Sequence, residues 1–382
     1  MRRPADAAWI IILVSFIATD WLFPSDVRAV EFTIVGPRAM GMGGAGVAVT
    51  TDALATYWNP AGLAMQKSVD IRVQASGQIT DRLGIADTIE EINDINTNDT
   101  SQANRDRLQG LLNRLNGASV SAAGAAGLYL KGYFGDHVFG FNVSDVATGG
   151  LFTPTPLTAS VSGTTLTVNG QLAVRGLEAR QAGLSYAYAL ADKTLSLGTT
   201  VKIIQGAAYA GSVRVVGSEG DFGFTSDLGK ANISTAIGID AGVIYHPFSW
   251  LRIGVVGKDL NQPTFDAPGG GEFKLIPQIR GSVAVNPYSS LTLTFDGDLT
   301  SNKTLLPGVK SRVLSIGGEQ TLFSEALSLR IGALKNVEDA QSIVIPTAGL
   351  GIGIGAFRLD IGGGYDFRER QALASGSLAL TF

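Results

Sequence analysis

The chain has 382 residues, a formal net charge of −4 and no cysteine. Because basic residues are not in excess, the composition argues against nucleic-acid binding. The absence of cysteine excludes disulfides, thiolate zinc sites and cysteine nucleophiles within this chain. Charged residues make up 16% of the chain, against about 25% in ordinary soluble domains. This deficit indicates either a large core or an apolar surface that faces lipid.

The N-terminus has the pattern of a secretory signal peptide over residues 1–29. Arg2 and Arg3 precede an apolar run at 7–18, and Val27 and Ala29 supply small residues for cleavage. The run is shorter than the ~20 residues that span a bilayer, although an uncleaved anchor is the alternative. No later stretch is apolar enough for a membrane helix, so a β-barrel is the membrane structure that we expect.

Strict alternation of apolar and polar residues dominates the rest of the chain. Leu291, Leu293 and Phe295, for example, alternate with Thr292 and Thr294. A period of two is typical of a strand with one apolar and one polar face. The pattern predicts about fourteen strands, at 68–79, 119–134, 136–150, 172–191, 194–210, 234–247, 250–262, 274–286, 289–300, 309–323, 326–336, 342–355, 357–367 and 372–382.

The connections between these strands favour a transmembrane barrel over a soluble sandwich. Tight turns alternate with long loops at 80–118, 151–171, 211–233, 263–273 and 301–308, as in barrels with short inner turns and long outer loops. Aromatic residues, which favour membrane interfaces, gather at the expected tight-turn end. They are Tyr133, Phe134, Tyr245, Phe248, Trp250, Tyr288, Phe323 and Phe357.

The first long loop, 80–118, predicts a small helical insertion. Leu108, Leu111, Leu112 and Leu115 recur at the spacing of one helix face, within a helix expected at 101–115 that follows another at 87–95. The insertion is either a helical pair that packs on the barrel rim or a gate or partner site.

Fourteen strands enclose more space than their own side chains can fill, so a plug is expected. Residues 30–66 precede the first strand, and their glycine-rich, apolar sequence predicts that they fold back into the lumen as a hatch. The segment 36–64 (GPRAMGMGGAGVAVTTDALATYWNPAGLA) resembles the hatch of FadL-type outer-membrane transporters. The motif residues that this resemblance implicates in gating are Gly41, Gly43, Gly44, Trp58, Asn59, Pro60 and Ala61.

The resemblance implies a fourteen-stranded antiparallel barrel, over residues 67–382, that carries fatty acids or aromatic hydrocarbons and releases them sideways into the membrane. The segments 260–265, 275–281 and 295–310 also resemble a TraF-like family named for conjugal transfer, whose relatives include secretion and assembly partners. Passive transport of hydrophobic or amphipathic compounds through the bacterial outer membrane is therefore the main hypothesis. A barrel that serves conjugation, secretion or envelope assembly with a protein partner is the alternative.

Other sequence features bear on partners and chemistry. The last strand ends in Phe382, which resembles the signal that barrels present to the outer-membrane assembly machinery. Gly41–Gly46 fits a dinucleotide-binding motif, but no βαβ unit follows it. The two histidines, His137 and His246, lie beside turns without evident metal or catalytic partners, so we expect no enzyme, metal or cofactor.

Several charged residues fall on predicted lumen faces, where charges usually pair with one another or with a plug. They are Lys202, Arg280, Asp296, Asp298, Glu319, Arg330 and Arg358.

Overall fold

The structure is a computed structural model that describes residues 32–82, 84–116, 119–218, 221–227, 229–269, 271–339, 342–366 and 371–382. The expected signal peptide at 1–29 and the first two residues of the expected hatch lie outside these ranges.

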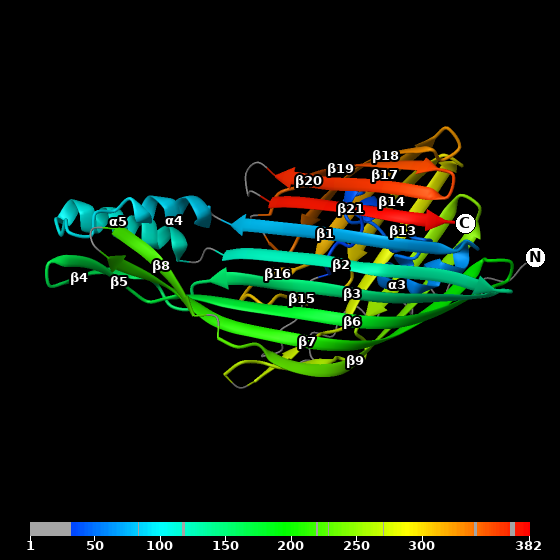
Figure 1. Cartoon of the computed structure of the whole chain (residues 1–382). Helices are drawn as coiled ribbons and strands as arrows, with labels where there is room; N and C mark the ends of the chain where they lie inside the picture. The colour runs from blue at the N-terminus through cyan, green and yellow to red at the C-terminus, as the bar shows by residue number, and fades with distance from the viewer. Residues whose placement is uncertain are drawn as a thin grey trace, which may run out of the picture.

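The wall of the molecule is a closed ring of fourteen antiparallel strands, which confirms the predicted fold class (Figure 1). Pairing of the last strand with the first, and of β6 with β7, leaves no open edge. The ring contains β1 (Asp70–Arg82), β2 (Ser119–Phe134), β3 (His137–Phe152), β6 (Leu172–Leu190), β7 (Leu195–Ser218), β9 (Asn232–Phe248), β10 (Leu251–Lys258), β13 (Gln278–Tyr288), β14 (Leu291–Asp298), β17 (Val313–Leu322), β18 (Leu327–Asn336), β19 (Ile345–Ile354), β20 (Phe357–Asp366) and β21 (Gln371–Thr381).

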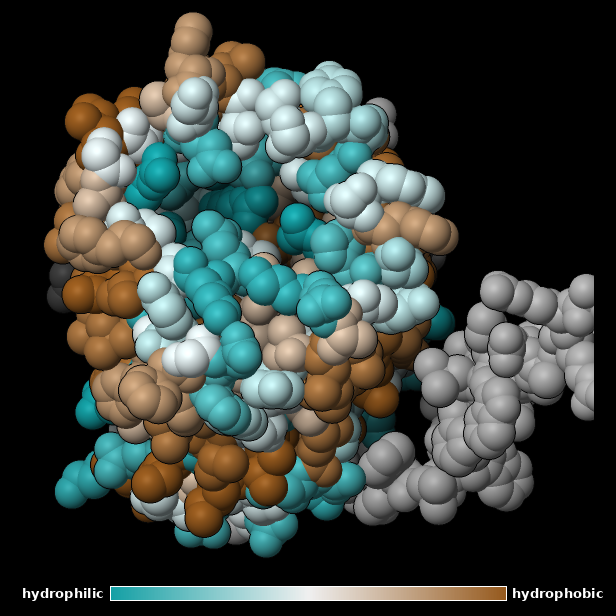
Figure 2. All heavy atoms as spheres, turned by 90° about the vertical axis from the view of Figure 1, so that its right-hand side faces the viewer, coloured by the Kyte–Doolittle hydropathy of each residue, from teal (hydrophilic) through white to brown (hydrophobic). Residues whose placement is uncertain are grey.

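The two faces of the wall differ as the alternation predicted. On β9, Ile239 and Val243 are exposed to the outside, whereas Asp240 and Gly242 between them are buried toward the lumen. The eight aromatic residues expected at the tight-turn end are all exposed there. Figure 2 shows that end face-on, with hydrophobic side chains on the flanks around a hydrophilic hollow. Because such a continuous apolar band is unfavourable in water, the wall is suited to lipid.

The long loops contain helices and short strands. The expected helices are present as α4 (Ile85–Asn93) and α5 (Gln102–Leu115), and Leu108, Leu111, Leu112 and Leu115 are buried. These helices pack on the hairpin β4 (Thr158–Ser162) and β5 (Thr165–Asn169), and on Val215 of the extended β7. β8 (Asp221–Asp227) pairs with that extension as a fifteenth strand of the sheet. Together they form a projection at the outer end (Figure 1).

Two other loops fold over the mouth of the lumen. They contain the short hairpins β11 (Thr264–Asp266) with β12 (Glu272–Lys274), and β15 (Asn302–Lys303) with β16 (Lys310–Ser311). Phe265 and Phe273 are buried in a cluster with Leu177 and Ile204 of the wall. The outer mouth is therefore partly covered by its own loops. Among the described residues, no helix is long and apolar enough to cross a membrane.

The outward face of β18 gives a direct test of lipid contact. Ile331 is 72% exposed on this face, and Ile331→Arg is expected to reduce the free energy of unfolding in lipid vesicles by about 2–4 kcal/mol. Ser328 on the same strand lines the polar hollow, so Ser328→Arg is the matched control and should have a much smaller effect. Denaturant titrations in vesicles measure both changes, and equal losses would contradict the assignment of faces.

Candidate functional site: the hatch and the lumen

Residues 32–66, called the hatch below, occupy the lumen near the tight-turn end. The hatch contains α2 (Pro37–Gly41), α3 (Ala55–Trp58) and the 3₁₀ helix η1 (Pro60–Met65). Pro37 and Pro60 stand at the first position of their helices, where proline's missing N–H costs nothing and its fixed φ is helical. Almost every hatch residue is buried.

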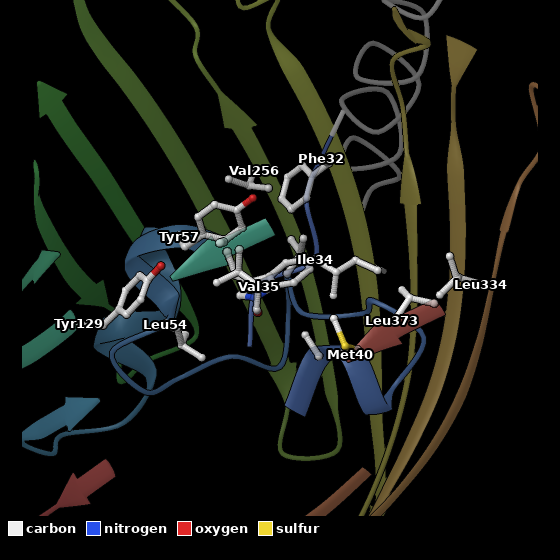
Figure 3. Close-up of a cluster of buried hydrophobic side chains, with 14 of the residues drawn as sticks. Phe32, Ile34, Val35, Met40, Leu54, Tyr57, Tyr129, Val256, Leu334 and Leu373 are labelled. Atoms are coloured by element: carbon white, nitrogen blue, oxygen red, sulfur yellow. The ribbon is translucent and has the colours of Figure 1, made fainter. Parts of the chain in front are cut away.

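Three aromatic residues, Phe32, Tyr57 and Trp58, lie together in the buried cluster of the hatch. Figure 3 labels Phe32 and Tyr57 among the buried side chains of this cluster. The ring of Phe32 lies 5.9 Å from that of Tyr57 and 5.2 Å from that of Trp58, between centroids. Tyr57 donates its hydroxyl to the carbonyl of Thr33 at 2.8 Å, and Trp58 Nε1 donates to the carbonyl of Val35 at 2.7 Å. These bonds fix residues 32–35 against α3, because each buried polar tip has its partner.

Asn59 joins the hatch to the wall. Its Nδ2 lies 3.2 Å from the carbonyl of Val47 in the hatch, 3.3 Å from that of Val243 on β9 and 3.4 Å from that of Val255 on β10. Its Oδ1 accepts from the N–H of Ala61 at 3.1 Å and so caps η1. One fully buried amide therefore contacts two stretches of the hatch and two neighbouring strands.

Wall glycines make room for this contact. A Cβ at Gly242 on β9 would overlap the Asn59 side chain, and a Cβ at Gly198 on β7 would overlap the Pro60–Ala61 backbone. Gly317 on β17 and Gly332 on β18 face Met42 in the same way. The hatch backbone thus lies directly on the wall backbone at positions where any larger side chain would push it away.

Buried charges of the wall hold the glycine-rich part of the hatch. Asp296 on β14 accepts from the N–H groups of Gly46 and Val47 at 2.8 and 2.9 Å, and the Ser282 hydroxyl also donates to it. Arg280 on β13 pairs with Asp298 at 2.6 Å and donates to the carbonyl of Gly44 at 3.4 Å. These contacts satisfy hatch backbone groups that would otherwise be buried without partners.

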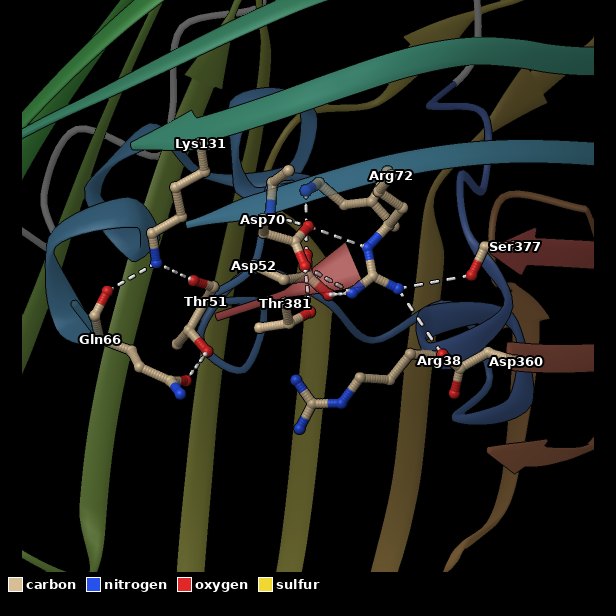
Figure 4. Close-up of polar contacts among 12 residues, drawn as sticks. Arg38, Thr51, Asp52, Gln66, Asp70, Arg72, Lys131, Asp360, Ser377 and Thr381 are labelled. Carbon is tan, nitrogen blue, oxygen red and sulfur yellow. Dashed lines mark hydrogen bonds and ion pairs between the residues drawn. The ribbon is translucent and has the colours of Figure 1, made fainter. Parts of the chain in front are cut away.

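A chain of ion pairs crosses the inner side of the hatch, and Figure 4 shows the part of it around Arg72 and Asp360. Arg38 of the hatch pairs with Glu319 at 2.6 Å, and Arg330 links Glu319 to Asp360 at 2.6 and 2.7 Å. Burial alone would lower the pKa of Arg38, but the adjacent Glu319 carboxylate raises it above its usual value. Removing one member would leave a buried charge unpaired, which typically costs about 3–5 kcal/mol.

The chain of ion pairs continues to the first strand. Arg72 on β1 lies 3.6 Å from Asp360, and it pairs at 3.2 Å with both Asp52 of the hatch and Asp70 of β1. Asp70 also accepts from the N–H of Ala53. The polar face of the wall and the hatch therefore share one charge network rather than separate pairs.

The structure brings the seven hatch residues singled out from the sequence into contact with the wall or with one another. Gly41 lies against Gly349 of β19, Gly43 donates to Thr347 at 2.9 Å, and both Gly43 and Gly44 have positive φ. Trp58, Asn59, Pro60 and Ala61 are buried as described above. Five of the expected lumen charges form ion pairs, namely Lys202, Arg280, Asp298, Glu319 and Arg330. Asp296 instead accepts hydrogen bonds from the hatch backbone, and Arg358 donates to the carbonyl of Glu325 at the rim.

The hatch separates two hollows of the lumen. Above it, Thr33, Tyr57 and wall residues such as Leu177, Ile204 and Lys258 line a cavity of about 50 Å³. Below it, Arg38, Asp52 and Gln66 with wall residues line a polar depression of about 220 Å³, the hollow seen in Figure 2. A molecule that crosses the barrel along its axis must therefore pass the hatch.

The described residues contain no cluster of histidine, aspartate and glutamate suited to a metal ion. His137 contacts the Tyr186 hydroxyl at 2.8 Å near a turn. Neither histidine lies in the lumen site described above.

Sequence reasoning missed the wall glycines, Lys258, and the pairing of Arg38 with Glu319. The glycines carry a detectable signal, because Gly198, Gly242, Gly317 and Gly332 occupy lumen-facing positions where the alternation predicts polar side chains. The pairing of Arg38 with Glu319 carries no such signal, because the two residues are 281 positions apart in the sequence.

A substitution at Gly242 tests the close packing of the hatch on the wall. Gly242→Ala is expected to lower the free energy of unfolding by about 1–3 kcal/mol, because the new Cβ overlaps Asn59. Gly132→Ala on β2 is the control, since nothing lies within 4 Å of its Cβ position. Unfolding in lipid vesicles and Trp58 fluorescence measure the effect. A Gly242→Ala protein as stable as the control would refute the close packing of the hatch on β9.

Comparisons with solved structures show that this barrel has the fold of several channels described as toluene or monoaromatic hydrocarbon transporters. The toluene transporter TbuX of Ralstonia pickettii has a TM-score of 0.57 at 16% identity, over 91% of this chain and 97% of that one. The CymD monoaromatic hydrocarbon channel gives 0.56 at 14%, over 92% and 98%. The Pseudomonas putida toluene transporter TodX gives 0.55 at 12%, over 92% and 98%. At these identities the likeness establishes the fold, and the similar proteins are channels rather than enzymes.

No curated protein sequence is significantly similar to the chain. A family model, however, matches residues 56–298, which is well over half of the sequence and runs from the middle of the hatch to the end of β14. The chain belongs to the family described as F plasmid transfer operon, TraF, protein.

Proposed function

We propose that this protein is an outer-membrane barrel for passive transport of hydrophobic or amphipathic small molecules, with the hatch as its gate. The observation that carries the proposal is the position of the hatch between the outer cavity and the inner depression. The similarity in fold to channels described as toluene or monoaromatic hydrocarbon transporters supports this function. Aromatic hydrocarbons and fatty acids are the compounds that we would test first.

The surroundings of the barrel follow from the same proposal. The apolar outer face would contact outer-membrane lipid, as the exposed side chains of β9 and β18 indicate. Phe382 follows the last strand and is 70% exposed, which suits a terminal signal for the barrel assembly machinery.

Gating requires that contacts between the hatch and the wall break and re-form. The contacts at Asn59 and Asp296 are hydrogen bonds worth about 0.5–3 kcal/mol each, depending on charge. Water that enters the opened lumen can replace them. A ligand that contacts the hatch rings from above can therefore shift the equilibrium, provided that it binds the open arrangement more tightly.

A reversible tether tests the gate. The chain has no cysteine, and a Cβ at Gly254 on β10 would lie 3.3 Å from the Cβ of Ala48 in the hatch, close to the separation in a disulfide. Ala48→Cys with Gly254→Cys is expected to abolish toluene or fatty-acid uptake into liposomes when oxidised and to restore it when reduced.

Each single-cysteine variant is the matched control and should transport under both conditions. Uptake that stays the same after complete oxidation would refute gating by this part of the hatch. Absence of saturable uptake by the wild-type protein would refute transport itself.

A non-transport role in conjugation, secretion or envelope assembly is the second candidate. The family match and the outer projection built from α4, α5, β4 and β5 favour it. Crosslinking in intact cells distinguishes the two: a stoichiometric protein partner on the projection supports the second role, and its absence together with hatch-dependent uptake supports the first.

A further inference from the structure

The hairpin of β11 and β12 is a self-contained unit over the outer mouth of the lumen. Its residues, 263–269 and 271–275, are called the lid below. At its base the N–H of Leu275 donates to the carbonyl of Pro263 at 2.9 Å, so the chain leaves the wall and returns to it at nearly the same point. Pairing of β11 with β12 holds the two strands together. The lid therefore keeps its shape through its own hydrogen bonds and can move as one body.

Two aromatic side chains of the lid pack on the lumen side of the wall. Phe265 and Phe273 are each 1% exposed, in a cluster with Leu177 and Ile204. A Cβ at Gly206 on β7 would lie 2.3 Å from the ring of Phe265, so this ring rests directly on the strand backbone. The contact is apolar and therefore has no directional bonds that must break when it separates.

The lid covers the cavity that lies above the hatch. Leu177 and Ile204, on which the lid packs, also line this cavity, and so does Leu275 of the lid. Thr33 and Tyr57 of the hatch line its inner side. The cavity, of about 50 Å³, thus lies between the lid on the outer side and the hatch on the inner side.

An asparagine next to the lid ties its base to the wall. Beyond the end of β10, the Asn261 side chain takes the place of a neighbouring strand. Its Oδ1 accepts from the N–H of Ile239 at 2.9 Å, and its Nδ2 donates to the carbonyl of Ile237 at 2.6 Å. The N–H of Asp266 in the lid donates to the Ser234 hydroxyl at 3.1 Å. All three bonds reach β9 at exposed positions, where each can be exchanged for a bond to water.

The chain enters the lid through a turn of unusual backbone conformation. Asp259 and Gln262 have φ values of 53° and 56°, in the left-handed region that residues other than glycine seldom occupy. Lys202 Nζ lies 2.9 Å from the Asp259 carboxylate and fixes the start of the turn on the wall. Strained positions of this kind are common in segments that switch, and a change of φ at Gln262 would turn the lid away from the wall.

We propose that the lid is an outer gate, which swings about residues 259–262 and admits small molecules to the cavity only while it is lifted. The inference goes beyond the transport function, because it adds a second gate in series with the hatch. A compound can then occupy the cavity while the hatch stays closed. Opening of the lid controls entry, and opening of the hatch controls passage to the inner depression.

A buried thiol on the inner side of the cavity tests the lid. The chain has no cysteine, and Thr33, which is 2% exposed, can be replaced by a cysteine of nearly the same size. Full-length Thr33→Cys protein in lipid nanodiscs is reacted with a small charged methanethiosulfonate, alone and combined with Asn261→Ala or Asn116→Ala. Asn116 is the matched control, because its amide makes the same two kinds of bond to the backbone of Leu157 in the outer projection.

Asn261→Ala is expected to raise the rate of thiol modification by about ten-fold or more, since the loss of two hydrogen bonds shifts the opening equilibrium by such a factor. Asn116→Ala should leave the rate unchanged. Equal rates in the Asn261→Ala and parent proteins, or equal acceleration by both alanine substitutions, would overturn the proposal.

A reversible tether on the lid supplies a second measurement. The Cγ of Phe265 lies 2.7 Å from the Cβ position of Gly206, so cysteines at both positions have Cβ atoms near the separation of about 3.5–4.5 Å in a disulfide. Oxidised Gly206→Cys with Phe265→Cys is expected to block uptake in the liposome assay above, and reduction to restore it. Each single variant should transport under both conditions. Uptake that persists unchanged after complete oxidation would overturn the lid as a gate.

The outcomes separate the lid from transport itself. Thiol modification that depends on Asn261, in a protein without any uptake, would retain the lid and refute transport. Uptake that the hatch tether blocks and the lid tether does not would retain transport and refute the lid.

Discussion

The fold depends on filling the lumen of a fourteen-stranded wall. The inward side chains of such a ring are too few to fill it, and without a plug the lumen would be a water-filled channel. The hatch solves this by lying backbone-on-backbone against the wall, at Gly198 and Gly242 on one side and at Gly317 and Gly332 on the other. Close packing at these points leaves small cavities in place of a continuous channel.

Close packing alone would leave many backbone groups without partners, because the hatch has little regular structure. The wall supplies these partners from its polar face. Asp296 accepts from two hatch N–H groups, and the wall carbonyls of Val243 and Val255 accept from the Asn59 amide. The ion pairs from Arg38 to Arg72 connect the hatch to β17, β18, β20 and β1. The same alternation that turns apolar residues outward thus provides the polar groups that hold the hatch.

Much of this architecture could be predicted from the sequence. The alternation of apolar and polar residues predicted all fourteen strands of the ring, and the helical spacing of the leucines predicted α5. Both patterns are local in the sequence. Prediction failed where long-range contacts decide the structure. The stretches 211–233, 263–274 and 301–311 contain paired strands that local patterns do not reveal. Lys258 looks like any polar strand residue until the aromatic rings of a distant segment are placed over it.

The central claim is that residues 32–66 close an otherwise open barrel. The most direct measurement is ionic conductance of single barrels in planar lipid bilayers, for the intact protein and for a variant that lacks residues 37–64, with heat-modifiable gel mobility as the check that both fold. The account predicts a nearly silent intact protein and a steady conductance at least ten-fold larger for the variant. A folded variant with the conductance of the intact protein would contradict it.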